Sequence, residues 1–243
     1  MKSLAPVFLL AIACAAPMLA ADPLTGFPFQ NETLRYSVKW PGGGSLGDAT
    51  LTAHKADAGG WDFDMAVDVD IPVVPIADRY KASAAGVDLC SATLERKISH
   101  GSKKVTEKTE FDQKRNVAQR QTLVPATADK PAGGGKSELA LPTCGRDALT
   151  FLYFARRELG QGRVPAASKI FFGSGYDVKM VYTGAMDIPV AGKPVVTDHL
   201  NVSVKGPASD FSFEIFYARD AARTPLLIKV PVTVGTVSLE LVR

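Results

Sequence analysis

The chain has 243 residues, and 46% of them are hydrophobic, which is enough to bury one sizeable core. The formal net charge is +3, with both signs spread along the chain, whereas a nucleic-acid binder gathers its basic residues on one surface. Composition therefore argues against a nucleic-acid partner. The 16 prolines and 21 glycines are dispersed, as in a folded domain with many turns, and this excludes a disordered or collagen-like chain.

The first residues have the pattern of a secretory signal peptide. Lys2 supplies a short positive start, and the segment from Leu4 to Met18 is almost wholly apolar. No other segment approaches the roughly 20 apolar residues of a spanning helix, so we expect no transmembrane span in the mature chain. The sequence predicts a signal peptide over residues 1–21 and a single β-rich domain over residues 22–243, periplasmic or secreted.

Two processing routes remain open, and they affect the cysteine count. Ala20 and Ala21 suit ordinary cleavage, whereas the segment 11–14 is a loose lipoprotein box that would make an outer-membrane lipoprotein acylated at Cys14. Either route leaves Cys90 and Cys144, and an even pair in an oxidising compartment favours a disulfide. A reactive thiol at Cys144 is the alternative, but neither a Cys-x-x-Cys motif nor a local histidine accompanies it.

Short runs with alternating apolar and polar residues fill the chain from Glu32 to Leu123, and this is the pattern of strands and turns. In the clearest run, Trp61, Phe63 and Met65 occupy one face and a row of aspartates occupies the other. We interpret Asp62, Asp64, Asp68 and Asp70 as a solvated, edge-protecting face rather than a calcium site. The predicted strands are 34–40, 46–53, 61–70, 76–84, 87–99, 105–112 and 117–123.

The chain changes character after residue 124. The segment from Pro125 to Pro142 contains three consecutive glycines and few large apolar residues, which predicts an exposed loop. Helical spacing then follows from Asp147 to Leu159, with Thr143 as the expected cap and Gly160 as the stop. Strands resume at 168–172, 176–188, 193–204, 211–218, 226–232 and 236–242.

One helix among roughly a dozen strands defines the expected fold. The class is mainly β: a large curved antiparallel sheet, or a partly open barrel of about a dozen strands, with one central helix. Sheets of this size curl, and the interior must be filled by side chains, by the helix or by a ligand. The sequence does not choose among these three.

The order of these landmarks resembles a family of exported bacterial proteins known as domain of unknown function 3108. The resemblance runs from Phe27 to Arg243, although Asn31 stands where the family usually has a glycine. It implies an exported, mostly β protein without an established activity; the layout is also similar to curved carriers that move lipids or lipoproteins across the periplasm. The matching segments are 29–38 with Trp40 and Gly47, 78–80, 95–98 leading to 111–112, 147–157, and 217–226 with Gly235.

Few residues have the spacing of a catalytic or metal-binding site. His54, His100 and His199 lie in separate predicted strands or turns and form no metal or nucleophile motif, so we predict no catalytic, cofactor-binding or metal-binding residues. Two arginine–carboxylate groups lie at strand ends or turns, where an ion pair could lock two sheet segments together. We interpret them as ion pairs that stabilise the fold rather than as ligand contacts. The two groups are Asp78 with Arg79, and Arg219 with Asp220 and Arg223.

Three functional hypotheses follow. The first is a non-catalytic envelope protein that binds a lipid or lipoprotein segment between curved sheet and helix, with Phe151, Tyr153 and Phe154 lining the site. The second is a structural or adaptor module that docks an envelope protein through an exposed strand edge. The third, an enzyme acting on envelope polymers, would need a cleft with two carboxylates of shifted pKa. The oligomeric state stays open.

Overall fold

The computed structural model describes residues 31–56, 59–71, 74–127, 130–207, 210–232 and 235–242. The predicted signal peptide over residues 1–21, its cleavage at Ala20 or Ala21, and Cys14 all lie outside the described residues.

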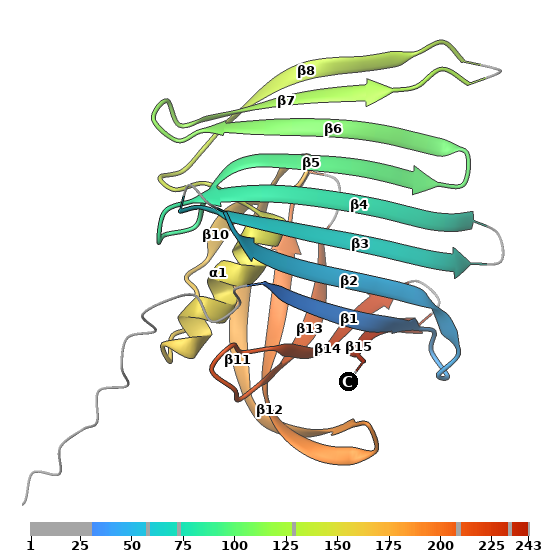
Figure 1. The fold of residues 1–243 in the computed structure, drawn as a ribbon, viewed down its shortest axis with the longest axis vertical. Coiled ribbons are helices and arrows are strands. Elements are labelled where there is room, and N and C mark those ends of the chain that lie inside the picture. Colours follow the sequence, from blue (N-terminus) through green and yellow to red (C-terminus); the bar gives the residue numbers. More distant parts are fainter. Residues whose placement is uncertain are drawn as a thin grey trace, which may run out of the picture.

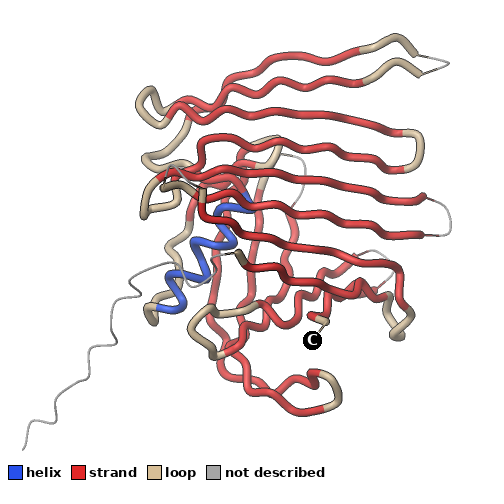
Figure 2. Tube along the Cα trace, in the orientation of Figure 1, coloured by secondary structure: helices blue, strands red, loops and turns tan. Residues whose placement is uncertain are grey.

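Fifteen strands and one helix make up the described part of the chain (Figures 1 and 2). All the strands belong to one sheet, in the order β8-β7-β6-β5-β4-β3-β2-β1-β15-β14-β13-β12-β11-β10-β9. The elements are β1 (Glu32–Lys39), β2 (Ser45–Lys55), β3 (Trp61–Ile71), β4 (Val74–Ala85), β5 (Cys90–His100), β6 (Lys103–Asp112), β7 (Val117–Val124), β8 (Gly133–Ala140), β9 (Arg146–Asp147), α1 (Ala148–Gly160), β10 (Ser168–Phe171), β11 (Gly175–Val190), β12 (Lys193–Lys205), β13 (Asp210–Ala218), β14 (Pro225–Val232) and β15 (Gly235–Leu241).

The sheet consists of two meanders, β1–β8 and β9–β15, which are joined where β1 pairs with β15, with Tyr36 opposite Leu241. Within each meander, strands that follow each other in the chain pair with each other, and β8 and β9 lie at the two ends of the sheet order. The pairs are antiparallel except β9 with β10. The predicted mainly β class is confirmed, but the described residues hold fifteen strands where about a dozen were expected. The two additional strands are β8 and β9.

The prediction of a loop from Pro125 to Pro142 was wrong in its second half, which forms β8. This strand pairs in register with β7, from Val124 opposite Gly133 to Val117 opposite Ala140. A strand at the end of a sheet needs few large apolar residues, which is why its sequence lacks the usual pattern. Gly134 is required there, because its φ is +151° and a Cβ would overlap the carbonyl oxygen of Thr122.

The aspartate row of β3 is solvated, as expected, but it does not protect an edge. Trp61 and Phe63 are buried on one face, while Asp62, Asp68 and Asp70 are exposed on the other. The strand lies between β2 and β4, inside the sheet. Alternation identifies the two faces of a strand but says nothing about its position in the sheet.

The N-cap of helix α1 lies four residues after the predicted cap at Thr143. The N-cap is Asp147, whose Oδ1 accepts hydrogen bonds from the backbone N–H groups of Leu149 at 2.8 Å and Thr150 at 2.9 Å. Its Oδ2 accepts from the hydroxyls of Thr150 and Ser91, and the second bond ties the helix start to β5. A carboxylate that is held by the sheet thus replaces the local threonine.

The sheet wraps around α1, so that the helix lies between its two halves (Figure 1). The backbone N–H of Ser91 on β5 donates to the carbonyl of Gly145, which immediately precedes β9, over 3.1 Å. This contact brings the last strand of the sheet order back to β5 and partly closes a barrel, leaving β6–β8 beyond the closure. No helix in the described residues combines the length and apolar character needed to cross a membrane.

Two main groups of buried side chains lie on opposite sides of α1. Tyr153 packs with the first group, which comes mostly from β1 to β5. Phe151 and Ala155 pack with the second group, which comes from β10 to β13. The helix therefore divides the interior of the barrel into two compartments.

Candidate ligand pocket

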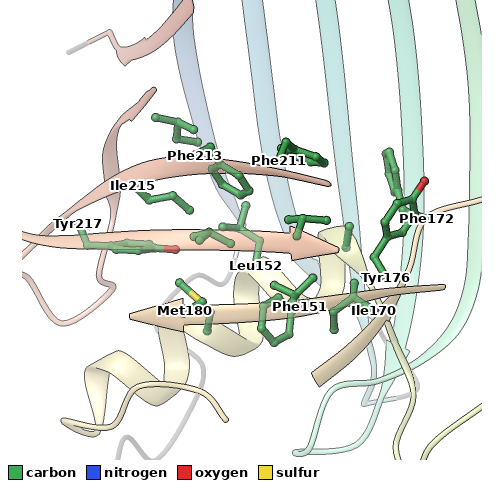
Figure 3. Close-up of a pocket in the computed structure, with 16 residues that line it drawn as sticks. Phe151, Leu152, Ile170, Phe172, Tyr176, Met180, Phe211, Phe213, Ile215 and Tyr217 are labelled. Atoms are coloured by element: carbon green, nitrogen blue, oxygen red, sulfur yellow. The ribbon is translucent and has the colours of Figure 1, made fainter. Parts of the chain in front are cut away.

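The compartment between α1 and the C-terminal half of the sheet contains an apolar pocket of about 490 Å³ (Figure 3). Its wall is made almost entirely of carbon atoms, and the only side-chain polar groups of the lining residues are two tyrosine hydroxyls. The lining residues are Ala148, Phe151, Leu152, Ala155, Ile170, Phe172, Tyr176, Val178, Met180, Val202, Val204, Phe211, Phe213, Ile215, Tyr217 and Ile228.

Strand alternation builds most of this wall. On β11, Val178 and Met180 face inward, while Lys179 between them is exposed. On β13 the inward residues are again every second one, from Phe211 to Tyr217. Because successive side chains of a strand point to opposite faces, β11, β12 and β13 each contribute two or more apolar groups to the pocket.

The pocket is open at one end and closed at the other. Phe211 is 45% exposed, Phe213 is half-buried, and Ile215 and Tyr217 are buried, so exposure falls steadily along β13. Tyr176 and Phe172 are also half-buried and lie on the same side of Figure 3 as Phe211. We call the Phe172, Tyr176 and Phe211 end the mouth, and the Tyr217 end the base.

The base contains a buried polar group. The hydroxyl of Tyr217 is inaccessible to solvent and makes no hydrogen bond within the described part of the chain. Burial raises the pKa of this hydroxyl far above its ordinary value, and the nearby positive charge of Arg156 opposes the rise. Tyr217 is therefore a neutral hydrogen-bond donor at physiological pH.

Arg156 holds the helix beside the base, and the sequence analysis missed this role. Its buried guanidinium donates to both carboxylate oxygens of Glu32, at 2.7 and 2.9 Å, and to the backbone carbonyls of Ala222 and Arg223. The one available signal was the position of Arg156 three and four residues after Tyr153 and Leu152, on the apolar side of the helix. An arginine near a helix end is usually solvated, so the pattern gave no reason to expect burial.

The structure places one of the three predicted ligand-lining residues in the wall of the pocket. Phe151 lines the pocket. Tyr153 is not among the lining residues: it is fully buried on the other side of the helix, stacked on Phe63 with ring centroids 4.2 Å apart. Phe154 also lies outside the lining set and packs under the guanidinium groups of Arg146 and Arg157. Residues two apart in a helix point about 160° away from each other, which turns Tyr153 away from the pocket side of Phe151. Phe154, three residues after Phe151, is its neighbour on the helix surface, and their ring centroids lie 6.1 Å apart.

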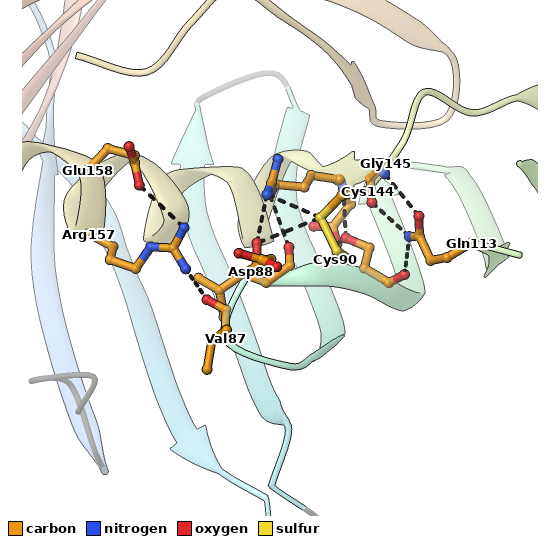
Figure 4. The surroundings of a disulfide bond; sticks show 12 residues. Val87, Asp88, Cys90, Gln113, Cys144, Gly145, Arg157 and Glu158 are labelled. Atoms are coloured by element: carbon orange, nitrogen blue, oxygen red, sulfur yellow. Dashed lines mark hydrogen bonds and ion pairs between the residues drawn. A yellow bond between two sulfur atoms is a disulfide. The ribbon is translucent and has the colours of Figure 1, made fainter. Parts of the chain in front are cut away.

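The disulfide between Cys90 and Cys144 is confirmed, with its Cα atoms 4.7 Å apart (Figure 4). It joins the first residue of β5 to the turn before β9, at the partial closure of the barrel. Gln113 strengthens the same joint by donating to the carbonyls of Ser91 and Gly145. Closing a loop of this length stabilises a fold by roughly 4 kcal/mol if chain entropy dominates.

The first predicted ion-pair group links neighbouring strands, but Asp78 and Arg79 each do so with other partners. One guanidinium nitrogen of Arg79 on β4 donates to both carboxylate oxygens of Asp68 on β3, at 2.8 and 2.9 Å, and Arg79 makes no ion pair with its neighbour Asp78. Asp78 instead accepts from the Tyr80 hydroxyl and contacts His100 on β5 at 3.0 Å. Adjacent residues of a strand point to opposite faces, so Asp78 and Arg79 have different surroundings.

The second predicted group behaves in the same way. Arg219 and Arg223 both pair with Asp198 on β12, at 2.8 and 2.6 Å. Asp220 accepts from the backbone N–H and the hydroxyl of Thr224, and so shapes the turn between β13 and β14. None of these side chains lines the apolar pocket.

The histidines and acidic residues form no metal site within the described residues. His54 is exposed, His100 contacts Asp78, and His199 stacks on Phe216 with centroids 4.3 Å apart. No carboxylate lines the pocket.

The fold and the pocket define a barrel-like β protein with one internal helix and an apolar hollow. Within this class, the chain belongs to the family described as protein of unknown function DUF3108, whose family model matches residues 35–242. The suspected family is thereby confirmed.

A solved structure has a similar fold: the β-barrel-like protein of domain of unknown function DUF1849 from Brucella abortus. The TM-score is 0.57 at 10% sequence identity, and the match covers 88% of this chain and 97% of that one. At this identity the likeness concerns the fold alone. No curated protein matches the chain.

Proposed function

We propose that this protein is exported to the cell envelope, where it binds an apolar or amphipathic ligand, such as a lipid or a lipoprotein acyl segment, without catalysis. The observation that carries the proposal is the pocket of about 490 Å³ between α1 and β10–β14, with its almost wholly apolar wall. Its volume is within the range of small-molecule sites, roughly 300–1,000 Å³.

A hollow of this kind is costly to maintain without an occupant. Protein interiors are close-packed, and each unfilled apolar volume forfeits dispersion contacts. The aromatic residues at the mouth add to the free-energy cost of the empty pocket, because their rings face water. Phe211, for example, is 45% exposed. An acyl chain would fill the hollow and cover the exposed rings, and this supports binding of an apolar ligand.

The chemistry of the wall favours binding over catalysis. Its side-chain polar groups are the hydroxyls of Tyr176 and Tyr217, and burial raises the pKa of Tyr217. A neutral phenol is a poor nucleophile and a poor base at neutral pH, and the lining contains no histidine, cysteine or carboxylate to activate it.

Two features support export. The Cys90–Cys144 disulfide is typical of proteins in oxidising compartments. The apolar segment from Leu4 to Met18 after Lys2 has the composition of a signal peptide. Cell fractionation followed by thiol labelling tests this part: we expect the protein in the envelope fraction with both cysteines blocked, and reactive thiols there would contradict it.

The binding proposal is tested with protein purified from its native location. Mass spectrometry of an organic extract should find lipid, and a delipidated sample should bind a fluorescent fatty-acid analogue. Val178→Phe fills the pocket and should lower this affinity at least tenfold, while Val181→Phe places the same ring on the opposite face of β11, where Val181 is 42% exposed, and should leave it unchanged. Equal affinities for both variants would contradict the proposal.

The methyl signals of the methionines show directly whether a ligand occupies the pocket. Met180 lines the pocket, Met65 packs against the buried group on the other side of α1, and Met186 is 47% exposed. In protein with ¹³C-methyl methionine, ligand should shift the Met180 signal and leave Met65 and Met186 in place. Shifts confined to Met186 would instead indicate surface adsorption.

A strand-edge adaptor is the second candidate, and the position of β8 favours it. This strand ends the sheet order, and within the described residues it pairs on one side only. An edge of this kind can accept a strand from a partner. Lys136→Pro removes a backbone donor from the edge and would abolish capture of an envelope partner, while leaving lipid binding by the pocket intact.

A further inference from the structure

The two hydroxyl groups of the pocket differ in their surroundings. Tyr176 is half-buried at the mouth, where water can reach its side chain. Tyr217 is fully buried at the base, and its hydroxyl makes no hydrogen bond within the described residues. Figure 3 shows this hydroxyl directed toward the other lining side chains. The closed end of the pocket therefore holds a buried donor that needs an acceptor.

A hydroxyl in this position is unfavourable in the empty protein. Burying a polar group without a hydrogen bond costs free energy, and phenylalanine would fill the same space without that cost. The neighbouring charged group, the guanidinium of Arg156, offers no acceptor because it only donates, and the Tyr217 hydroxyl makes no hydrogen bond with the Glu32 carboxylate that pairs with Arg156. The hydroxyl of Tyr217 is thus suited to a group that enters from the pocket.

We propose that the ligand is a single-chain amphiphile with an uncharged oxygen acceptor, such as an alcohol, an ester or a protonated acid, and that it enters with this oxygen first to accept a hydrogen bond from Tyr217. This inference rests on the proposed function and names the ligand class of the same pocket. The hydrocarbon tail lies along Val178 and Val202 and ends among the aromatic rings of the mouth.

The acceptor is uncharged because nothing in the pocket compensates an ion. Moving an isolated carboxylate into an apolar site is far more costly than moving a neutral oxygen. The buried cation nearest the base, Arg156, is already balanced by Glu32. Decanoate should therefore bind more weakly than decanol at neutral pH, and its affinity should rise as the pH falls toward the pKa of the acid.

The test compares decanol with undecane, which has a methyl group in place of the hydroxyl, in wild-type protein and in Tyr217→Phe. Affinity is measured from the Met180 methyl signal. We expect Tyr217→Phe to weaken decanol binding about 3- to 10-fold, the effect of one hydrogen bond, and to leave undecane binding unchanged. Tyr176→Phe is the matched control at the mouth and should change neither affinity.

Each other outcome has a distinct meaning. If both ligands bind and Tyr217→Phe affects neither, the orientation is refuted and the proposed function stands. Loss of decanol binding in Tyr176→Phe would place the oxygen at the mouth and also refute the inference. If neither ligand binds to the wild-type protein, the proposed function itself fails.

A measurement on the wild-type protein gives the same answer without a variant. Intermolecular nuclear Overhauser effects should connect the carbinol protons of decanol with the Met180 methyl group, and the terminal methyl protons with the ring of Phe211. The reverse pattern would show that the oxygen faces the mouth and would overturn the inference.

Discussion

Both sides of α1 face apolar residues, but they are packed differently. On the side of β1–β5, Tyr153 stacks on Phe63 with ring centroids 4.2 Å apart, and both rings are fully buried. On the side of β10–β14, Phe151 faces a pocket of about 490 Å³. A row of apolar residues along a strand therefore creates a core or a cavity depending on what lies opposite.

The sizes of the inward side chains account for part of this difference. On the packed side, the strands alternate large and small inward residues, with Ala49 and Ala53 on β2 and Ala82 and Ala84 on β4, all buried. Small residues let the aromatic groups of α1 and β3 interdigitate. On the hollow side, the inward residues of β11–β13 that line the pocket are valine or larger, while α1 contributes small residues at Ala148 and Ala155.

The largest expected effect comes from truncating one aromatic ring on each side. Phe63→Ala should lower the free energy of unfolding by about 3–5 kcal/mol, because it leaves a void in filled space. Phe213→Ala should cost about 1 kcal/mol, because its ring already borders a hollow and is half-buried. Urea unfolding of delipidated protein measures both losses. Equal losses would mean that the two compartments are packed alike.

The next effect concerns the ion pair that holds the helix between the compartments. Glu32→Ala leaves the buried guanidinium of Arg156 without its carboxylate and should cost about 3 kcal/mol. Glu240→Ala removes the partner of Lys39 from an exposed ion pair, in which the side chain of Glu240 is 44% exposed and that of Lys39 is 34% exposed. This loss should lower the free energy of unfolding by under about 1 kcal/mol. A loss at Glu32 no greater than that at Glu240 would show that Arg156 does not fix the helix.

The smallest effect is a pH dependence at the other end of α1. Burial raises the pKa of Asp147 above its ordinary value of 3.8, although four hydrogen bonds oppose the rise. A raised pKa in the folded state contributes stability that is fully present below pH 3.8 and is lost as the pH rises through the folded-state pKa. The stability of wild type minus that of Asp147→Asn should therefore fall as the pH rises across this acid range. Urea titrations at several pH values test this, and a constant difference would exclude the shift.

Much of the fold could be predicted because its signals are local. Alternation located thirteen of the strands, the switch to helical spacing located α1, and the cysteine count indicated the disulfide. The missed strand β8 lacks alternation because it forms the end of the sheet, and β9 is only two residues long. The cap was assigned to Thr143 rather than Asp147 because the bond from Ser91, 56 residues away, has no local signal.

The candidate site was less predictable. Phe151 could be identified from its helix, but the pocket depends on which of two similar apolar faces is left unfilled. The partners of the predicted ion pairs were likewise fixed by strand pairing, which placed Asp198 beside Arg219 and Arg223. Arg156 and Glu32 are separated by 124 residues, and no pattern in either segment anticipates their contact.

By itself, the sequence determined the position of thirteen of the strands, the apolar face of the alternating ones, the position of the helix and the cysteine pair. These properties follow from the geometry of successive residues, with a period of two in strands and 3.6 in helices. Only the tertiary structure decided that one side of α1 is solid and the other hollow. The space between helix and sheet depends on the volumes of side chains brought together from the whole chain, and on the distant Glu32–Arg156 pair that positions the helix between them.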